Sequence, residues 1–183
     1  GIPAQRTFPV FRNFARAVTD FLSISSMNEE RLRAACAVRG IEHLDRALRG
    51  GAGAILFGAH LGPWEVAGAC LAGLGYRMHT VALEHPSARV TRFFSAKRKR
   101  WGLTDYPAGA YAAGLLRGLE KGEIVVLLVD RNFSNRGLRL RFFGSDVLLP
   151  DGHVALAART GAALVPCCCY YTASGSIEVL IEE

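Results

Sequence analysis

A histidine and a glutamate five positions apart form the first candidate catalytic pair along the chain. His60 and Glu65 lie in the stretch FGAHLGPWE (57–65), which follows a run of apolar residues. A carboxylate bonded to one ring nitrogen orients a histidine and supports its imidazolium form, so the other nitrogen can take a proton from a hydroxyl or amine. Gly62 and Pro63 make the turn, and proline suits the first turn of a helix. The spacing fits either a catalytic pair or an ordinary strand–helix junction.

Two further acidic residues follow predicted strands. Glu84 comes after the predicted strand 77–83, and Asp130 ends the segment 123–130, whose run IVVLLV is apolar and typical of an interior strand. In a parallel α/β sheet, ligands bind beyond the carboxyl ends of the strands. We therefore expect His60, Glu84 and Asp130 to reach the same edge of the sheet.

The elements that must position these residues alternate along the chain. Apolar strand-like segments and helical patterns follow one another from residue 51 onward, each helix ending near a glycine. This order predicts an α/β fold, a layered α/β/α sandwich with a largely parallel central sheet, preceded by N-terminal helices. The expected strands are 53–59, 77–83, 123–130, 137–144, 162–172 and 176–183, the last antiparallel to the one before; the expected helices are 64–75, 87–102, 110–122 and 152–161.

Residues 1–50 are expected to form a helical segment, and residues 51–183 the core. The stretch 10–22 is an amphipathic helix that could pack on the core or lie at a membrane surface. Asn28 is expected to cap a helix that continues to about Arg39. We expect the core to be truncated at its C-terminal end.

Composition narrows the class of protein. The 183 residues carry a formal net charge of +6, with basic runs at 89–102 and 130–142. Such runs suit phosphorylated substrates, anionic lipid or nucleic acid, and equally a solvated basic face. The sequence contains no stretch of 18 consecutive apolar residues, so it predicts no membrane-spanning helix. The five cysteines have no C-x-x-C spacing, and three are consecutive, which favours buried apolar residues over a metal site.

Several ordered motifs carry a resemblance to a known family. GIEHLDRALRGGAGAILFGAHLGPWEVAG is followed by EIVVLLVDRNFSNRGLRLRFFGSDVLLPDGHVALAARTGAALVP, with an acidic residue and arginine after a strand, then F-F-G, P-x-G and T-G-A-x-x-x-P. Over roughly residues 38–170 the chain resembles the bacterial lipid A late acyltransferases, which include the mycobacterial phosphatidylinositol mannoside acyltransferases and belong to the larger glycerolipid acyltransferase group. This resemblance implies the fold of that group.

The resemblance implies roles for the residues of the first motif. His60 and Glu65 match the family's H-x-x-x-x-D/E pair, with His60 as general base and Glu65 as its orienter. The implied reaction moves a fatty acyl group from a thioester to a hydroxyl of a membrane glycolipid. Backbone amides near Gly62, or the side chain of Arg98, would stabilise the tetrahedral oxyanion.

Five residues are implied to contact substrate. Glu84 and the pair Asp130 and Arg131 match positions of the phosphatidylinositol mannoside branch, and a basic residue of the next helix falls at Lys97 or Arg98. Acceptors of both kinds, lipid A precursor and phosphatidylinositol mannoside, stay open.

The resemblance also implies partners and location. The acyl donor would be acyl-carrier protein or acyl-CoA, with no metal and no bound cofactor. We expect action at the cytoplasmic face of the bacterial inner membrane, through peripheral binding or an anchor outside this chain, and no binding of nucleic acid.

Three residues depart from the family pattern. Pro63 stands where the family usually has asparagine, and Asp151 and His153 stand where small residues or proline are commoner. The alternative function is a non-catalytic module that binds phosphate, anionic lipid or nucleic acid through 89–102 and 130–142. That alternative predicts salt-sensitive binding with no dependence on His60.

Overall fold

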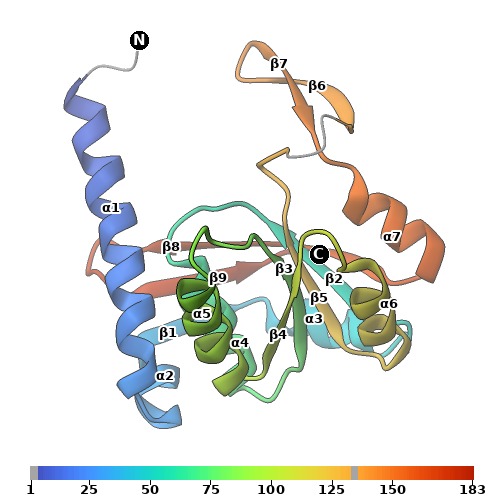
Figure 1. Ribbon diagram of the computed structural model, residues 1–183, viewed down its shortest axis with the longest axis horizontal. Helices are drawn as coiled ribbons and strands as arrows, with labels where there is room; N and C mark the ends of the chain where they lie inside the picture. Colours follow the sequence, from blue (N-terminus) through green and yellow to red (C-terminus); the bar gives the residue numbers. More distant parts are fainter. Residues whose placement is uncertain (1–3, 133–135) are drawn as a thin grey trace.

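The computed structural model describes residues 4–132 and 136–183 as helices and strands around one main sheet (Figure 1). The helices are α1 (Ala4–Ser23), the short 3-10 helix η1 (Ile24–Ser26), α2 (Glu29–Ala35), α3 (Ile41–Leu48), α4 (Trp64–Gly73), α5 (Ala88–Arg100), α6 (Ala112–Glu120) and α7 (Gly152–Thr160). The strands are β1 (Cys36–Arg39), β2 (Ala54–Gly58), β3 (Met78–Ala82), β4 (Leu103–Pro107), β5 (Ile124–Leu128), β6 (Leu138–Phe142), β7 (Ser145–Leu149), β8 (Ala163–Tyr171) and β9 (Ile177–Ile181).

The main sheet has seven strands in the order β1-β9-β8-β2-β5-β3-β4, and all its neighbours are parallel except β8 and β9. Helices α1, α4 and α5 lie to one side of it and α6 and α7 to the other (Figure 1). The layered, largely parallel α/β architecture predicted from the sequence is therefore confirmed. The antiparallel pairing of the last two strands is confirmed as well.

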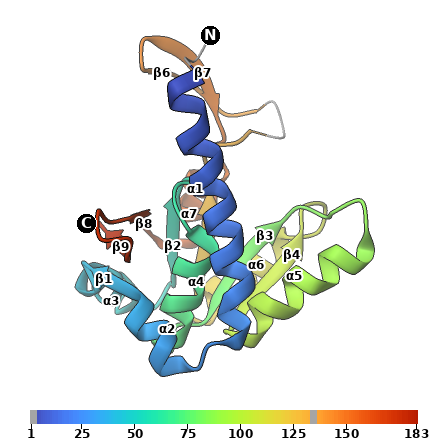
Figure 2. The same ribbon diagram turned by 90° about the vertical axis from the view of Figure 1, so that its left-hand side faces the viewer.

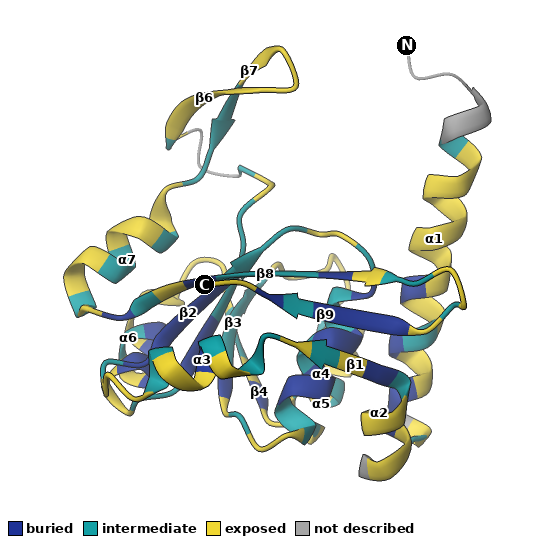
Figure 3. Cartoon of the chain, turned by 180° about the vertical axis from the view of Figure 1, so that it is seen from behind, coloured by how far each residue is buried: buried dark blue, intermediate teal, exposed yellow. Residues whose placement is uncertain are grey.

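Two clusters of buried side chains lie on the two faces of the sheet. The larger joins α1, α2 and α4 to the strands, with Phe21, Leu32 and Leu71 nearly inaccessible to solvent. The smaller joins α6 to the opposite face through Leu115 and Val125. Figure 3 shows that the buried residues follow the main sheet and the helices packed on it. Because the interior strands are covered on both faces, they are apolar almost throughout.

Three strands were not expected. Residues 36–39 form β1, not the end of a helix; Asn28 does cap α2, but α2 ends at Ala35. Pairing of β1 with β9 outweighs the modest helix preference of these residues. The strand β4 has the sequence LTDYP, whose Asp and Pro are poor strand formers, and β7 pairs only with β6.

The division of the chain at residue 50 stays a prediction. The structure adds that β1, from the N-terminal segment, is an edge strand of the main sheet. The segment 1–50 therefore contributes a strand as well as helices. Among residues 4–132 and 136–183, no helix has the length and apolar character to cross a membrane.

Two segments project beyond the core on the same side. The first half of α1 extends away from the sheet (Figures 1 and 2). The β6–β7 hairpin extends in the same direction, and Figure 1 shows it at some distance from α1. The hairpin forms a two-stranded sheet separate from the main one. The loop after β2 and the end of β5 lie on this same side of the sheet (Figure 1).

Candidate active site

His60 is brought to Asp130 by the register of two neighbouring strands. β2 and β5 are parallel, with Gly58 paired to Leu128, and the Val129 amide donates to the Gly58 carbonyl at 2.8 Å. His60 and Asp130 each lie two residues beyond that pair. The same offset on two aligned strands places their side chains together, and Nδ1 of His60 lies 2.8 Å from Oδ1 of Asp130.

This contact defines the tautomer of the histidine. A carboxylate accepts hydrogen bonds only, so Nδ1 carries a proton and donates it to Asp130; in the neutral imidazole the lone pair is then on Nε2. Nε2 has no hydrogen-bond partner among the described residues, and the His60 side chain is 30% exposed. An oriented imidazole with an accessible Nε2 is what a general base requires.

Glu65 does not make the contact that the sequence predicted. Its carboxylate accepts from Arg98, with Oε2 3.0 Å from Nε and Oε1 2.5 Å from one terminal guanidinium nitrogen. The expected His60–Glu65 pair is therefore wrong as a hydrogen bond, and Asp130 takes the place assigned to Glu65. Helix α4 begins at Trp64, whose ring lies edge-on to the imidazole at 5.1 Å, so Trp64 rather than Glu65 packs against His60.

Arg98 is the centre of a second polar cluster. Besides the two bonds to Glu65, its other terminal nitrogen donates to Oδ2 of Asp105 at 3.0 Å, and Ser95 donates to the same oxygen at 2.7 Å. Burial by itself lowers the pKa of Arg98, but the hydrogen bonds and charges of Glu65 and Asp105 outweigh it and raise the pKa. The cluster joins the start of α4 to α5 and β4.

The turn before α4 depends on glycine. Gly62 has φ +62°, and a Cβ atom at this position would come within 2.3 Å of the Cys169 carbonyl oxygen. Only glycine accepts that conformation and that approach at low cost. Pro63 is buried at the N-cap position of α4 and has no side-chain cap hydrogen bond. The Gly62 amide has no acceptor among the described residues, so it can donate to a bound substrate.

The other substrate-binding candidates are dispersed. Glu84 is exposed and forms no hydrogen bond or ion pair with another described residue. Lys97 donates to the carbonyl of Leu22 at 3.0 Å and so ties α5 to α1. Arg131 is exposed beside Asp130. The structure therefore brings together His60 and Asp130, and separately Glu65 and Arg98. Glu84 follows β3, which is parallel to β5 and β2, so it lies at the same edge of the sheet as His60 and Asp130, as predicted, without a hydrogen bond to either.

Two residues of the site were missed. Asp105 was not singled out because its strand, β4, was not predicted, and an acidic residue in LTDYP reads as a turn. Trp64 was not assigned a role at the site, yet its ring lies next to both His60 and Phe14 of α1, with the Phe14 ring centroid 6.2 Å away. Its place inside the motif was the available signal.

The cysteines supply no nucleophile at this site. All five are free thiols, and Cys36, Cys70 and Cys169 are buried, as predicted. Burial raises the pKa of Cys167 and of Cys169 to about 12. Thiols with such pKa values stay protonated and unreactive near neutral pH. No group of three His, Cys, Asp or Glu side chains suited to a metal occurs within the described part of the chain.

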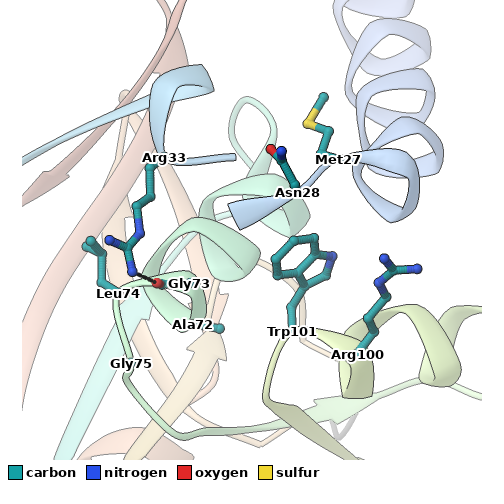
Figure 4. Close-up of a pocket in the computed structure, with 9 residues that line it drawn as sticks. All are labelled: Met27, Asn28, Arg33, Ala72, Gly73, Leu74, Gly75, Arg100 and Trp101. Atoms are coloured by element: carbon teal, nitrogen blue, oxygen red, sulfur yellow. Dashed lines mark hydrogen bonds between the residues drawn. The ribbon is translucent and has the colours of Figure 1, made fainter. Parts of the chain in front are cut away.

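A pocket of about 480 Å³ lies away from the His60 edge of the sheet (Figure 4). It is lined around Asn28, Gly73 and Trp101, where Arg33 donates to the Gly73 carbonyl at 3.0 Å. Gly73 and Trp101 mark the C-terminal ends of α4 and α5, so this pocket is at the edge opposite to His60. It is separate from the candidate active site.

Comparison with known proteins decides the family. A family model described as bacterial lipid A biosynthesis acyltransferase matches residues 9–181. The chain belongs to this family. The motifs that carry the resemblance and the His60 edge of the sheet fall within the matched residues.

Curated relatives are mycobacterial. The chain is 28% identical to a phosphatidylinositol mannoside acyltransferase of Mycobacterium tuberculosis (strain CDC 1551 / Oshkosh) over 169 residues, which cover 89% of this chain and 54% of that protein. It is 29% identical to the protein of the same description from Mycolicibacterium smegmatis (strain ATCC 700084 / mc(2)155) over 167 residues, 89% of this chain and 55% of that protein. The chain spans about half the length of the curated relatives it matches.

Proposed function

We propose that this chain carries the catalytic edge of an acyltransferase that moves a fatty acyl group from a thioester to a hydroxyl of a membrane glycolipid. One observation carries the proposal: Nδ1 of His60 is bonded to Asp130 at 2.8 Å while Nε2 has no partner in the described structure. Family membership supports the reaction class. The donor is acyl-carrier protein or acyl-CoA.

In the proposed mechanism His60 is the general base. Nε2 takes the proton of the acceptor hydroxyl as its oxygen attacks the thioester carbonyl. Asp130 holds Nδ1–H and stabilises the imidazolium that forms. The tetrahedral intermediate then collapses, the C–S bond breaks, and the leaving thiolate takes the proton from Nε2. No metal or bound cofactor enters this sequence of steps.

The oxyanion of the intermediate requires a donor already in place. The Gly62 amide is our candidate, because it lies two residues after His60 and has no acceptor among the described residues. Arg98 is less suited, since the nitrogens that bond Glu65 and Asp105 are already engaged. We assign Glu65, Arg98 and Asp105 to holding the start of α4, and with it the turn that carries Gly62.

Substrate contacts are proposed for the exposed candidates. Arg131, directly after Asp130, would bind a phosphate of the acceptor, and Glu84 would accept from a sugar hydroxyl. Lys97 is already bonded to α1, so we expect it to act by holding that helix. The similarity to mycobacterial phosphatidylinositol mannoside acyltransferases favours phosphatidylinositol mannoside over a lipid A precursor as acceptor.

Docking at the membrane is assigned to α1. Phe8 and Phe11 on its projecting half are 71% and 68% exposed, whereas Ala17 and Phe21 further along the helix are buried in the core. An exposed apolar face on a helix with arginines suits the interface of an anionic bilayer. We propose peripheral action at the cytoplasmic face of the inner membrane.

The test is transfer of a labelled acyl chain by the purified chain and by His60→Ala. Phosphatidylinositol mannoside and a lipid A precursor are offered as acceptors, each with acyl-carrier protein and acyl-CoA as donor. We expect His60→Ala to lower kcat at least about 100-fold, and the exposed His85→Ala to act as wild type. Wild-type activity of His60→Ala would refute the mechanism and favour the binding module.

A further inference from the structure

The β6–β7 hairpin has two chemically different faces. Alternation along the strands places Leu138, Leu140 and Phe142 on one face, and the register adds their partners Leu149, Val147 and Ser145. Arg139 and Arg141 lie on the other face. All five residues of β6 are exposed to solvent. The β6 half of the hairpin therefore presents an exposed apolar face backed by arginines, whereas Val147 and Leu149 of β7 are partly buried.

The tip of the hairpin is aromatic. Phe142 and Phe143 lie with ring centroids 4.6 Å apart, and the Phe143 side chain is 93% exposed. Phe143 has φ +48°, in the left-handed region that a bulky residue rarely adopts, and Gly144 follows with φ +79°. A tight two-residue turn would be better served by asparagine or aspartate than by phenylalanine. The aromatic residue therefore calls for an explanation outside the fold of the hairpin.

Little in the core supports this hairpin. It is a two-stranded sheet apart from the main sheet, and such hairpins are marginally stable in water unless a surface covers the apolar face. At its base Asn132 donates to the carbonyls of Arg136 and Leu148, at 2.8 and 3.3 Å. These bonds hold the start of the hairpin and leave its tip directed away from the core (Figure 3).

We propose that the hairpin is a second membrane-docking element, which inserts Phe142 and Phe143 at the surface of an anionic bilayer. Residues 136–149 contain three arginines and one aspartate, a charge that complements acidic lipid headgroups. The hairpin and the first half of α1 project to the same side (Figures 1 and 2), and Figure 1 shows them apart from one another. The loop after β2 lies on that side of the sheet as well (Figure 1). A planar surface contacts both projections at once and brings lipid to the strand ends.

This inference rests on the proposed function only in that the substrate is a lipid. The binding test uses the full chain with vesicles of phosphatidylcholine alone or mixed with phosphatidylglycerol. We expect Phe142→Ser/Phe143→Ser to weaken binding to mixed vesicles by about tenfold or more. Leu74→Ser, an exposed leucine at the opposite edge of the sheet, is the matched control and binds as wild type.

The contribution of the hairpin arginines and the depth to which the tip inserts are measured in separate experiments. Arg139→Gln and Arg141→Gln are each expected to weaken binding to mixed vesicles about fivefold, with a smaller loss at high salt and on pure phosphatidylcholine. We expect brominated lipid to quench the tryptophan fluorescence of Phe143→Trp more strongly than that of the wild-type chain. Unquenched emission on bound vesicles would overturn insertion of the tip.

Activity distinguishes this inference from the proposed function. Phe142→Ser/Phe143→Ser is expected to transfer acyl chains normally in detergent micelles and poorly on vesicles, with thermal unfolding unchanged. Vesicle binding equal to wild type would overturn the docking role and leave the catalytic proposal standing. A wild-type dimer that becomes a monomer in this variant, with vesicle binding unchanged, would assign the apolar face to a second copy instead.

Discussion

The edge of the sheet around His60 and the two projections use their side chains in opposite ways. At the edge, polar groups are bonded to one another: His60 to Asp130, and Arg98 to Glu65 and Asp105. On α1 and the hairpin, apolar groups such as Phe11 and Phe143 face solvent. Bonded polar groups suit catalysis, which needs side chains held in place. Exposed apolar groups suit a surface that docks on a membrane.

The largest expected effect tests which carboxylate supports His60. Asp130→Asn leaves an amide that need not accept from Nδ1, so the wrong tautomer becomes available, and we expect kcat to fall between about 100-fold and 10⁴-fold. Glu65→Gln is expected to lower kcat by less than about tenfold, because Glu65 bonds Arg98 and not His60. Steady-state transfer kinetics measure both. Equal losses in two equally stable variants would return Glu65 to the role predicted from spacing.

Arg98→Met tests whether the second cluster is structural. Arg98 is 14% exposed, and its removal leaves Glu65 and Asp105 as carboxylates without their cation. We expect a loss of about 3–5 kcal/mol in the free energy of unfolding, measured by urea denaturation. Lys99→Met, on the exposed part of the same helix, is the control. A small loss of stability with a large rise in KM would instead assign Arg98 to substrate binding.

Trp64 is expected to position His60 from α4. Its ring packs edge-on to the imidazole and also contacts Phe14 of α1. We expect Trp64→Leu to lower kcat about tenfold with little change in KM, because the imidazole loses its packing on one side. Trp64→Phe should recover most of the activity. Equal losses of kcat in Trp64→Leu and Trp64→Phe would mean that an aromatic ring at this position does not by itself position His60.

The projections should contribute little to stability. Phe8→Ser/Phe11→Ser removes exposed side chains, so we expect the free energy of unfolding to change by less than about 0.5 kcal/mol per residue. Vesicle binding should fall by about tenfold. Urea denaturation and co-sedimentation with vesicles measure the two quantities on one sample. A marked loss of stability would show that this half of α1 serves the fold after all.

The smallest change in stability is expected from His153 in α7, the helix that follows the hairpin. His153 packs against Phe57, with the two rings tilted and their centroids 5.1 Å apart, and burial lowers the pKa of His153, with Asp151 acting in the opposite direction. Since the unfolded chain then binds the proton more readily, stability is complete above the usual value of 6.5 and falls as the pH drops below it. We expect less than about 1 kcal/mol, measured by denaturation between pH 5 and 7, roughly the histidine range. His153→Gln should flatten the curve.

Local patterns in the sequence account for most of the fold. Period-3.6 and apolar segments predicted α4, α5 and α6 and the strands β2, β3 and β5 near their observed bounds. They also predicted α1, although this helix begins at Ala4 and not at the expected Val10. The strands β1 and β4 were missed because their residues have weak strand preference and become strands through pairing with β9 and β3. Pairing partners distant along the chain leave no local signal.

At the site, the order of residues along the chain establishes which side chains are available: His60 after β2, Asp130 after β5, and Gly62 at a turn that requires a left-handed backbone. Tertiary structure decided which of them meet. The spacing of His60 and Glu65 allows a contact along the chain, but the parallel register of β2 and β5 brings Asp130 instead, and α5 draws Glu65 to Arg98. Partner choice depends on the relative placement of whole elements, which spacing along one segment does not encode.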